Sequence, residues 1–153
     1  MIIKPGDWAD RFTDSSDNLH LFVAGGISEC QDWQTGFTKS LEDLERLVMF
    51  NPRRNDFDIK NTNMSEDQII WEYSALKAAD AVSFWFPDYT IAPITLFELG
   101  KELGRKSVIF VGVGQAYHRR FDVELQVRLA NPNIEIVYTL EDLSKQVRNW
   151  VKA

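Results

Sequence analysis

The stretch AVSFWFPD, residues 81–88, is the strongest single indication of the fold. Six small or apolar residues are followed by Pro87 and Asp88, so the pattern predicts a short strand that is buried on both faces. Two further runs have the same character, LHLFVA at residues 19–24 and SVIFVGVG at residues 107–114. Continuous apolar strands are typical of a parallel sheet that helices cover on both faces.

Helical signals lie between these strands. A helix is predicted to begin at Ser65, where Gln68 completes a capping box, and another runs from Pro93 to a glycine cap at Gly104. The other expected elements are helices over residues 32–46, 117–130 and 139–151 and strands over residues 47–50 and 134–138. For five such strands the natural arrangement is a flavodoxin-like α/β fold, a doubly wound parallel sheet in the order 2-1-3-4-5.

Length and composition indicate one domain over residues 1–153, in which residues 1–18 are an extended lead-in. The 17 lysines and arginines against 23 acidic residues give a net charge of −6, which argues against a nucleic-acid polymer as partner. One cysteine and two histidines exclude a disulfide framework and a Cys/His zinc site, and suit the cytoplasm. No signal peptide, membrane-spanning run or cofactor motif is found, so neither a membrane nor a cofactor is expected.

Ligands of doubly wound sheets bind outside the carboxyl ends of the strands, beside the point where the strand order reverses. Here the loops at that edge begin at Gly25, Asn51, Pro87 and Gly112. In the first of them, AGGIS, Gly25 and Gly26 precede Ile27 and let a ligand come close to the backbone. A tight turn from strand to helix would use the same glycines, and the two interpretations have similar weight.

Two glutamates are expected near this edge, Glu72 and Glu98, each on a helix beside apolar residues. Either one alone is most simply a solvated surface charge, and Glu98 can face Lys101 one turn further along its helix. As a half-buried pair, however, they have the altered acidity that chemistry requires, and they can divide a glycosyl transfer between a nucleophile and a proton donor.

The helix that carries Glu72 is expected to pack through an apolar stripe. That stripe includes Ile69, Ile70 and Tyr73, which recur at helical spacing. Trp71 lies next to Glu72 and is a candidate contact for a ligand.

Taken in order, AGGIS, NPRR, a helix bearing WE, AADAVSFWFPD and a helix bearing FELG resemble the nucleoside 2-deoxyribosyltransferase superfamily. The resemblance is to its deoxyribosyltransferase-like branch, found in bacteria and phages, and spans roughly residues 19–140. It implies an enzyme that acts on 2′-deoxynucleosides, with Glu98 as the nucleophile at C1′ and Glu72 as the acid that protonates the base. It also implies a homo-oligomer, a dimer or higher, in which Asn133 reaches the site of a neighbouring subunit.

The chain departs from the superfamily pattern at Ala92, where the transferases carry an aspartate that orients the substrate, six residues before the nucleophile. Asp88, at the end of the strand expected over residues 81–86, is the candidate replacement for that aspartate. Four aromatic residues on or beside the loops either stack on a nucleobase or fill the core: Trp33, Phe57, Trp85 and Tyr89. Substrate contacts are expected from Gly25, Gly26, Ile27, Asn51, Arg53, Arg54, Trp71, Asp88, Tyr89 and Asn133.

Arg53 and Arg54 leave the substrate class open. A guanidinium matches the geometry of phosphate, so the NPRR loop is able to hold a 5′-phosphate, as in the N-glycosidases of the superfamily that hydrolyse deoxynucleoside monophosphates. Alternatively, one arginine pairs with a structural carboxylate and the other is solvated. A nucleotide-binding module without turnover is a further alternative, since the acid at position 92 is missing. For a purely structural partner domain the sequence shows no large exposed apolar stripe.

Overall fold

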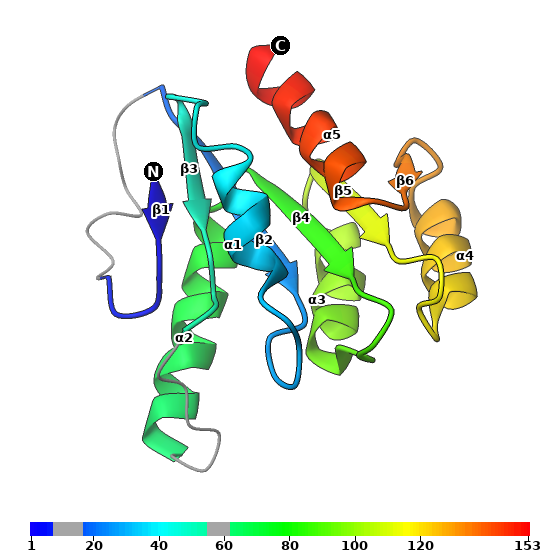
Figure 1. Cartoon of the computed structure of the whole chain (residues 1–153), viewed down its shortest axis with the longest axis horizontal. Helices are drawn as coiled ribbons and strands as arrows, with labels where there is room; N and C mark the ends of the chain where they lie inside the picture. Colours follow the sequence, from blue (N-terminus) through cyan, green and yellow to red (C-terminus); the bar gives the residue numbers. More distant parts are fainter. Residues whose placement is uncertain (8–16, 55–61) are drawn as a thin grey trace.

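The computed structural model describes residues 1–7, 17–54 and 62–153, and these form a six-stranded sheet with helices on both faces (Figure 1). The strands are β1 (Ile2–Ile3), β2 (Leu19–Gly25), β3 (Leu47–Phe50), β4 (Ala81–Phe86), β5 (Val108–Val113) and β6 (Ile136–Val137). The helices are α1 (Trp33–Lys39), α2 (Thr62–Ala78), α3 (Pro93–Leu103), α4 (Arg120–Ala130) and α5 (Leu140–Lys152). The sheet order is β1-β3-β2-β4-β5-β6, and each neighbouring pair is parallel.

The predicted flavodoxin-like order is confirmed, with one strand more than expected. Strands β3-β2-β4-β5-β6 are the predicted order 2-1-3-4-5. The prediction of five strands was wrong because Ile2 and Ile3, in the segment interpreted as an extended lead-in, pair with β3 at the edge of the sheet. The amides of Met49 and Asn51 donate to the carbonyls of Met1 and Ile3, over 2.8 and 2.9 Å. A two-residue strand is too short to leave a periodic pattern in a sequence.

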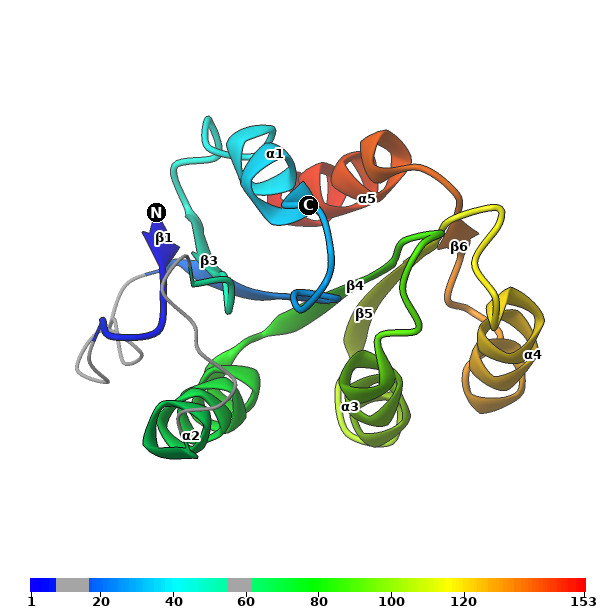
Figure 2. The same ribbon diagram turned by 60° about the horizontal axis from the view of Figure 1, so that its bottom comes forward.

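Helices cover the sheet in two layers. Figure 2 shows α2, α3 and α4 on one face and α1 and α5 on the other. The buried side chains of β4 alternate between these layers: Val82, Phe84 and Phe86 belong to the core that α2, α3 and α4 cover, and Ala81 and Trp85 to the opposite core. The apolar run in β4 is continuous because both of its faces are buried, as the sequence indicated.

The packing of α2 differs from the prediction. The helix begins at Thr62, so Ser65 lies within it and does not cap it. Its buried residues are Gln68, Trp71, Ala75 and Leu76. Ile69, Ile70 and Tyr73 are each more than half exposed. Apolar side chains surround much of this helix, so their spacing alone does not determine which face packs against the sheet.

Several helix ends are as predicted. Pro93 is the first residue of α3 and Gly104 caps its C-terminus. At the start of α5, the hydroxyl of Thr139 accepts a hydrogen bond from the amide of Asp142 over 3.0 Å. The first helix is shorter than predicted, because α1 ends at Lys39 and the chain continues in tight turns.

Large apolar side chains are exposed on the outer surfaces of the α2, α3, α4 layer. In addition to the three residues of α2, they are Ile94 and Phe97 on α3 and Phe121, Leu125 and Leu129 on α4. The expectation that no large apolar stripe is exposed is therefore not met. Their spacing is that of buried helical residues, and only the packing of the helices shows that they point outward.

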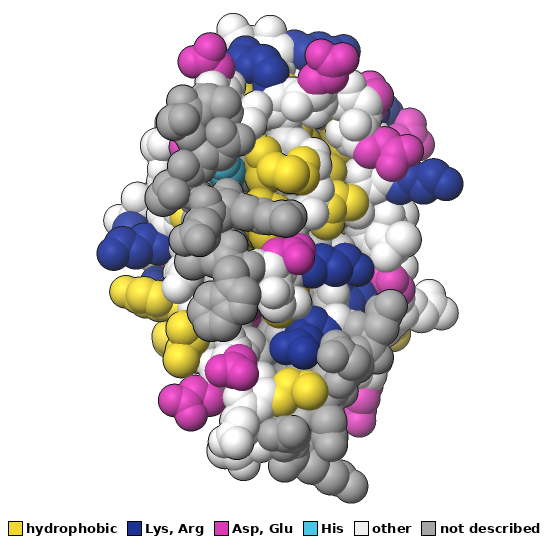
Figure 3. Space-filling view, turned by 90° about the vertical axis from the view of Figure 1, so that its left-hand side faces the viewer, with side chains coloured by type: hydrophobic (Ala, Val, Ile, Leu, Met, Phe, Trp, Pro, Cys, Tyr) yellow, Lys and Arg dark blue, Asp and Glu magenta, His cyan; other side chains and the backbone are white. Residues whose placement is uncertain are grey.

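The face that carries β1 has a mixed surface. Acidic and basic side chains are interspersed there, with hydrophobic side chains among them (Figure 3). Among the helices in the described part of the chain, none has the length and hydropathy of a membrane span.

Candidate active site

A cavity of about 310 Å³ lies at the carboxyl edge of the sheet, between α2, α3 and the loops that follow β2 and β3. The residues of its wall include Gly25, Ile27, Arg54, Glu72 and Glu98. The strands around it are β3, β2 and β4, where the order of the sheet reverses. The cavity therefore lies at the edge where the sequence predicts a ligand site, and both glutamates line it.

Glu72 and Glu98 come from different helices of the same layer. Glu72 lies on α2 and Glu98 on α3, and both helices cover the same face of the sheet (Figure 2). Both side chains are half-buried and line the same cavity. A pair on opposite faces of the sheet would have excluded a shared site, and the two glutamates instead line one cavity on the same face.

Burial changes the acidity of both glutamates. It raises the pKa of Glu98 to about 8, and the negative charge of Glu72 adds to this effect, while Lys101 opposes it. Burial also raises the pKa of Glu72, against a hydrogen bond from Gln68 that favours its ionised form. Two carboxylates that interact in this way lose their protons in separate steps.

Gln68 is a member of the site that the sequence analysis did not identify as one. Its Nε2 donates to Oε1 of Glu72 and to the carbonyl oxygen of Pro52, each over 2.8 Å. The side chain is buried and lines the cavity. Gln68 lies four residues before Glu72 on the same helix, and this spacing is the signal from which the contact was predictable. The capping-box interpretation assigned Gln68 to a helix end instead.

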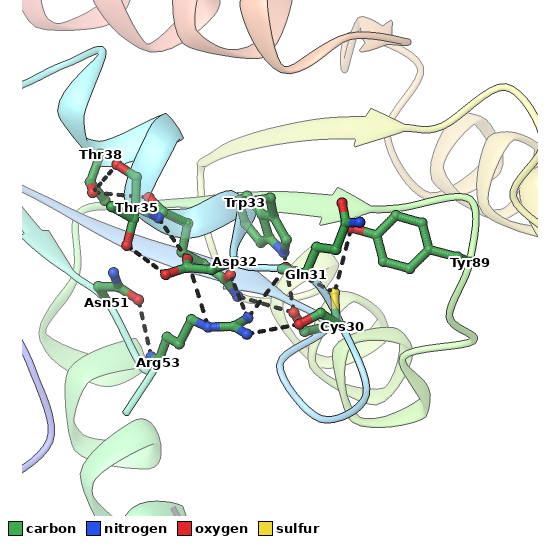
Figure 4. Close-up of polar contacts among 11 residues, drawn as sticks. Cys30, Gln31, Asp32, Trp33, Thr35, Thr38, Asn51, Arg53 and Tyr89 are labelled. Carbon is green, nitrogen blue, oxygen red and sulfur yellow. Dashed lines mark hydrogen bonds and ion pairs between the residues drawn. The ribbon is translucent and has the colours of Figure 1, made fainter. Parts of the chain in front are cut away.

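The two arginines of the NPRR loop have different surroundings. Arg54 lines the cavity, whereas Arg53 does not. The Arg53 guanidinium donates to the carbonyl of Cys30 over 2.7 Å and to Oε1 of Gln34 over 3.1 Å, and lies 3.6 Å from Asp32 (Figure 4). Arg53 thus fits the alternative in which one arginine of the loop pairs with a structural carboxylate, here Asp32. It anchors the loop between β2 and α1.

Asn51 also has a local role in the structure. It is buried, and its Oδ1 accepts a hydrogen bond from the amide of Arg53 over 3.0 Å. Asn51 is not part of the cavity wall. Because the bond spans two residues, it fixes the backbone where the chain leaves β3, and so it holds the loop that carries Arg53 and Arg54.

The two glycines of AGGIS lie in a tight turn that also borders the cavity, so both interpretations of this segment apply. A Cβ at Gly25 would lie 2.2 Å from Cζ2 of Trp33 and 2.7 Å from the carbonyl oxygen of Trp85. A Cβ at Gly26 would lie 2.8 Å from Cγ2 of Thr90. The carbonyl of Gly26 accepts hydrogen bonds from the side chains of Trp33 and Gln34. The turn is therefore closely packed, while Gly25 and Ile27 also line the cavity.

Most of the aromatic candidates are core residues. Trp33 and Trp85 are buried in the core under α1 and α5. Trp71 is buried in the opposite core, with its ring centroid 6.4 Å from those of Phe22 and Phe50. None of the three tryptophans lines the cavity. Phe57 lies outside the described residues.

Tyr89 and Asp88 lie on the loop between β4 and α3. The Tyr89 ring is exposed, with its hydroxyl 4.0 Å from Sγ of Cys30, and it is not part of the cavity wall. A carboxylate oxygen of Asp88 accepts a hydrogen bond from the amide of Ala116 over 3.0 Å. Asp88 therefore joins this loop to the one after β5. The structure does not bring it to the cavity wall.

Ala92 and Asn133 complete the set of sequence candidates. Ala92 is buried immediately before α3, with a left-handed φ of 46°. Asn133 is exposed on the loop that precedes β6, so in an all-parallel sheet it lies at the edge opposite to the cavity. Within one chain Asn133 cannot serve this cavity, and its contribution to the site of a neighbouring subunit stays a prediction.

A search of the described residues for a metal centre finds no group of three or more His, Cys, Asp or Glu side chains that could hold an ion. A family model described as nucleoside 2-deoxyribosyltransferase like matches residues 18–117. The match runs from the start of β2 past the end of β5, so it includes both glutamates and the whole cavity wall. A search of curated proteins found none that matches the chain.

Proposed function

The chain belongs to the nucleoside 2-deoxyribosyltransferase-like family, and we propose that it cleaves or transfers the N-glycosidic bond of a 2′-deoxynucleoside through a covalent deoxyribosyl intermediate on Glu98. The observation that carries this proposal is the meeting of Glu72 and Glu98, both with raised pKa values, in one cavity. The cavity, about 310 Å³, is within the range for small-molecule sites.

In the first displacement, a carboxylate oxygen of Glu98 forms a bond to C1′ of the deoxyribose as the C1′–N bond breaks. The electron pair of that bond leaves with the base, which takes the proton of the Glu72 carboxyl group. The transition state resembles an oxocarbenium ion, so the negative charge of Glu98 stabilises it.

In the second displacement, a nitrogen of another base, or a water molecule, attacks C1′ and gives its proton to the Glu72 carboxylate. The bond to Glu98 breaks and its electron pair returns to the carboxylate. Two inversions give net retention at C1′. An incoming base gives an exchanged nucleoside, and water gives free deoxyribose.

Incubation of the protein with each deoxynucleoside and a different free base, followed by chromatography, tests this proposal. We expect exchanged nucleoside or free base, and we expect Glu98→Gln to lower the rate by about 10⁴ or more, as loss of a nucleophile does. Glu72→Gln should cost about 10²–10⁴, the contribution of a general acid. Glu66→Gln is the matched control, since Glu66 is exposed on α2 outside the cavity. A wild-type chain that turns over no nucleoside or nucleotide would contradict the proposal.

A second candidate is hydrolysis of deoxynucleoside 5′-monophosphates. The observation in its favour is that Arg54 lines the cavity together with the two glutamates. A guanidinium at that position is suited to a 5′-phosphate. In this reading water is the acceptor, and added base does not change the product.

A nucleotide-binding module without turnover is favoured by one observation, the side chain of Ala92 in place of an acid. In that case a nucleotide raises the melting temperature of the protein while chromatography shows no product. Stabilisation that is unaffected by Glu98→Gln would support the module, and product formation excludes it.

The proposed assembly is a homo-oligomer, a dimer or higher, in the cytoplasm. Exposed apolar side chains on α2, α3 and α4 support association, because contiguous apolar surface is typical of subunit interfaces. A neighbour could then bring Asn133 to this cavity. The free, partly exposed thiol of Cys30 suits a reducing compartment.

A further inference from the structure

Gln68 has one orientation that its neighbours permit. The carbonyl of Pro52 can only accept a hydrogen bond, so the amide group of Gln68 must turn its NH₂ toward it, and the 2.8 Å contact is made by Nε2. The second hydrogen of that NH₂ points to Oε1 of Glu72, also 2.8 Å away. Flipping the amide would set the oxygen of Gln68 against the carbonyl of Pro52.

This orientation leaves the other end of the amide unsatisfied. Oε1 of Gln68 is buried and has no hydrogen-bond partner in the described part of the chain. A buried acceptor without a partner is destabilising, so the two donated bonds determine the arrangement. An NH₂ group that donates to a carboxyl oxygen stabilises the carboxylate more than the neutral acid, so this contact opposes the rise in the pKa of Glu72 that burial causes.

Glu98 has no comparable partner. Within the described residues its carboxyl group makes no hydrogen bond and no ion pair, although it lines the same cavity as Glu72. A carboxyl group in this position is favoured in its neutral form, because nothing replaces the water that burial removes.

We propose that Gln68 is a positioning residue of this site: its amide keeps Glu72 ionised before substrate binds, so that the single proton of the glutamate pair resides on Glu98. The inference deepens the proposed function, on which it rests for its catalytic meaning. Attack on C1′ needs an ionised Glu98 and a protonated Glu72. Transfer of one proton from the Glu98 carboxyl to the Glu72 carboxylate produces that state without exchange with solvent.

A substrate can drive this transfer. A leaving base whose nitrogen or oxygen lone pair faces Glu72 favours a protonated Glu72, since two acceptors in contact repel. The cationic character that develops at C1′ favours an ionised Glu98. Before substrate binds, Gln68 thus holds the site in its unreactive protonation state, and the correct ligand reverses it.

Other charged and titratable groups face the pair from each neighbouring element. Arg54, after β3, lines the cavity. Lys101 and Glu102 lie on α3 and act on Glu98 in opposite directions. Phe22 and Ala24 of β2 line the cavity and carry no charge. Among the hydrogen bonds between described side chains, the one that Glu72 accepts comes from Gln68, so this is the contact to alter.

Titration of the two carboxyl groups by ¹³C NMR tests the proposal on the whole chain without substrate, with glutamate labelled at Cδ and the signals assigned from Glu72→Gln and Glu98→Gln. In the wild-type protein we expect Glu72 to titrate at lower pH than Glu98. In Gln68→Met the midpoint for Glu72 should rise by about one pH unit or more, the effect of losing a hydrogen bond to a charged group. The midpoint for Glu98 should fall, because its neighbour is then neutral.

Ser65→Ala is the control, since Ser65 lines the same wall of α2 and makes no hydrogen bond to Glu72 in the described residues. It should leave both midpoints unchanged. A folded Gln68→Met protein with an unmoved Glu72 midpoint, or a wild-type protein in which Glu72 titrates above Glu98, overturns the proposal. Gln68→Asn, which is one methylene too short to reach both acceptors, serves if the methionine variant does not fold.

The outcome is separate from that of the proposed function. If Gln68→Met moves the midpoints and no nucleoside is turned over, the inference stands and the proposed function fails. If nucleosides are turned over and the midpoints do not respond to Gln68, the function stands and the inference fails.

Discussion

Arg53 and Arg54 are adjacent in the chain, yet only Arg54 lines the cavity that holds the two glutamates. The guanidinium of Arg53 is instead hydrogen-bonded to the carbonyl of Cys30 and to the side chain of Gln34. Neighbouring residues in an extended segment point in different directions, so the two guanidinium groups separate where the chain leaves β3. One anchors a loop and the other faces the ligand site.

This separation predicts different effects for the two alanine variants. Arg54→Ala should raise KM for a deoxynucleoside monophosphate by about 10- to 100-fold, the value of a charge-assisted hydrogen bond, and leave KM for the unphosphorylated nucleoside unchanged. Arg53→Ala should lower the free energy of unfolding by about 1–3 kcal/mol, because it leaves partly buried acceptors without a donor. Steady-state kinetics and denaturant unfolding measure the two effects. Equal KM changes for both substrates in Arg54→Ala would contradict a phosphate role.

The raised pKa of Glu98 predicts a dependence of stability on pH. The pKa is about 8 in the folded protein, above the ordinary value of 4.5. Between these values the folded state binds a proton that the unfolded state has released, so the stability from this group is full below pH 4.5 and is lost as pH rises through 8. Glu98→Gln removes this loss.

Thermal unfolding of wild type and Glu98→Gln across pH 4 to 9 checks this expectation. The melting temperature of the variant relative to wild type should increase with pH. At pH 9 the corresponding difference in the free energy of unfolding should be on the order of 1–3 kcal/mol once exposure to solvent is taken into account. A difference between the two proteins that is constant over the whole range would show that the pKa of Glu98 is not raised by folding.

The packing of Gly25 predicts a steric effect. Gly25→Ala places a Cβ against the ring of Trp33 and the main chain of Trp85, and the backbone of β4 cannot move aside easily. We expect a loss of about 2 kcal/mol or more in the free energy of unfolding. Gly36→Ala is the matched control: a Cβ there meets nothing within 4 Å inside α1, so it should stabilise by about 0.5–1 kcal/mol. Urea unfolding of both variants measures the contrast, and similar effects would contradict it.

The exposed apolar surface predicts an assembly that one charge can disrupt. Phe97 is 70% exposed on α3 beside the cavity. Phe97→Asp should shift the protein toward monomers in sedimentation velocity, because a buried unpaired carboxylate costs several kcal/mol at an interface. Lys39→Asp, an exposed change on α1 on the other face of the sheet, should leave the assembly unchanged. A wild-type protein that is monomeric at high concentration would refute the proposed oligomer.

The parts of the fold that were predictable are those that local sequence determines. A strand buried on both faces must be apolar throughout, and this identified β2, β4 and β5. Pro93 and Gly104 marked the ends of α3, since proline fits a first turn and glycine a terminal one. The edge strand β1 was not predicted, because two residues are too few to show a periodic pattern. The start of α2 was misplaced, because serine is a common N-cap residue and Ser65 lies inside the helix.

The candidate site also has features that the sequence predicted and features that it did not. The topology of a doubly wound sheet placed the ligand site at its carboxyl edge, and both glutamates are found there. The sequence could not show that Trp71 turns into the core, since a helix with apolar side chains on most of its surface does not reveal its buried face. The rotation of α2 that buries Trp71 also brings Gln68 and Glu72 to the cavity.

The sequence by itself determined a parallel α/β sheet, its order and the edge at which a ligand would bind, because strand burial and crossover connections depend on residues close together in the chain. Only the tertiary structure decided which side chains meet at that edge. It brought Glu98 of α3 to Glu72 of α2, tied Gln68 to Pro52, and separated Arg54 from Arg53. Such contacts depend on how helices rotate and pack against the sheet, and packing is a property of surfaces that are distant in sequence.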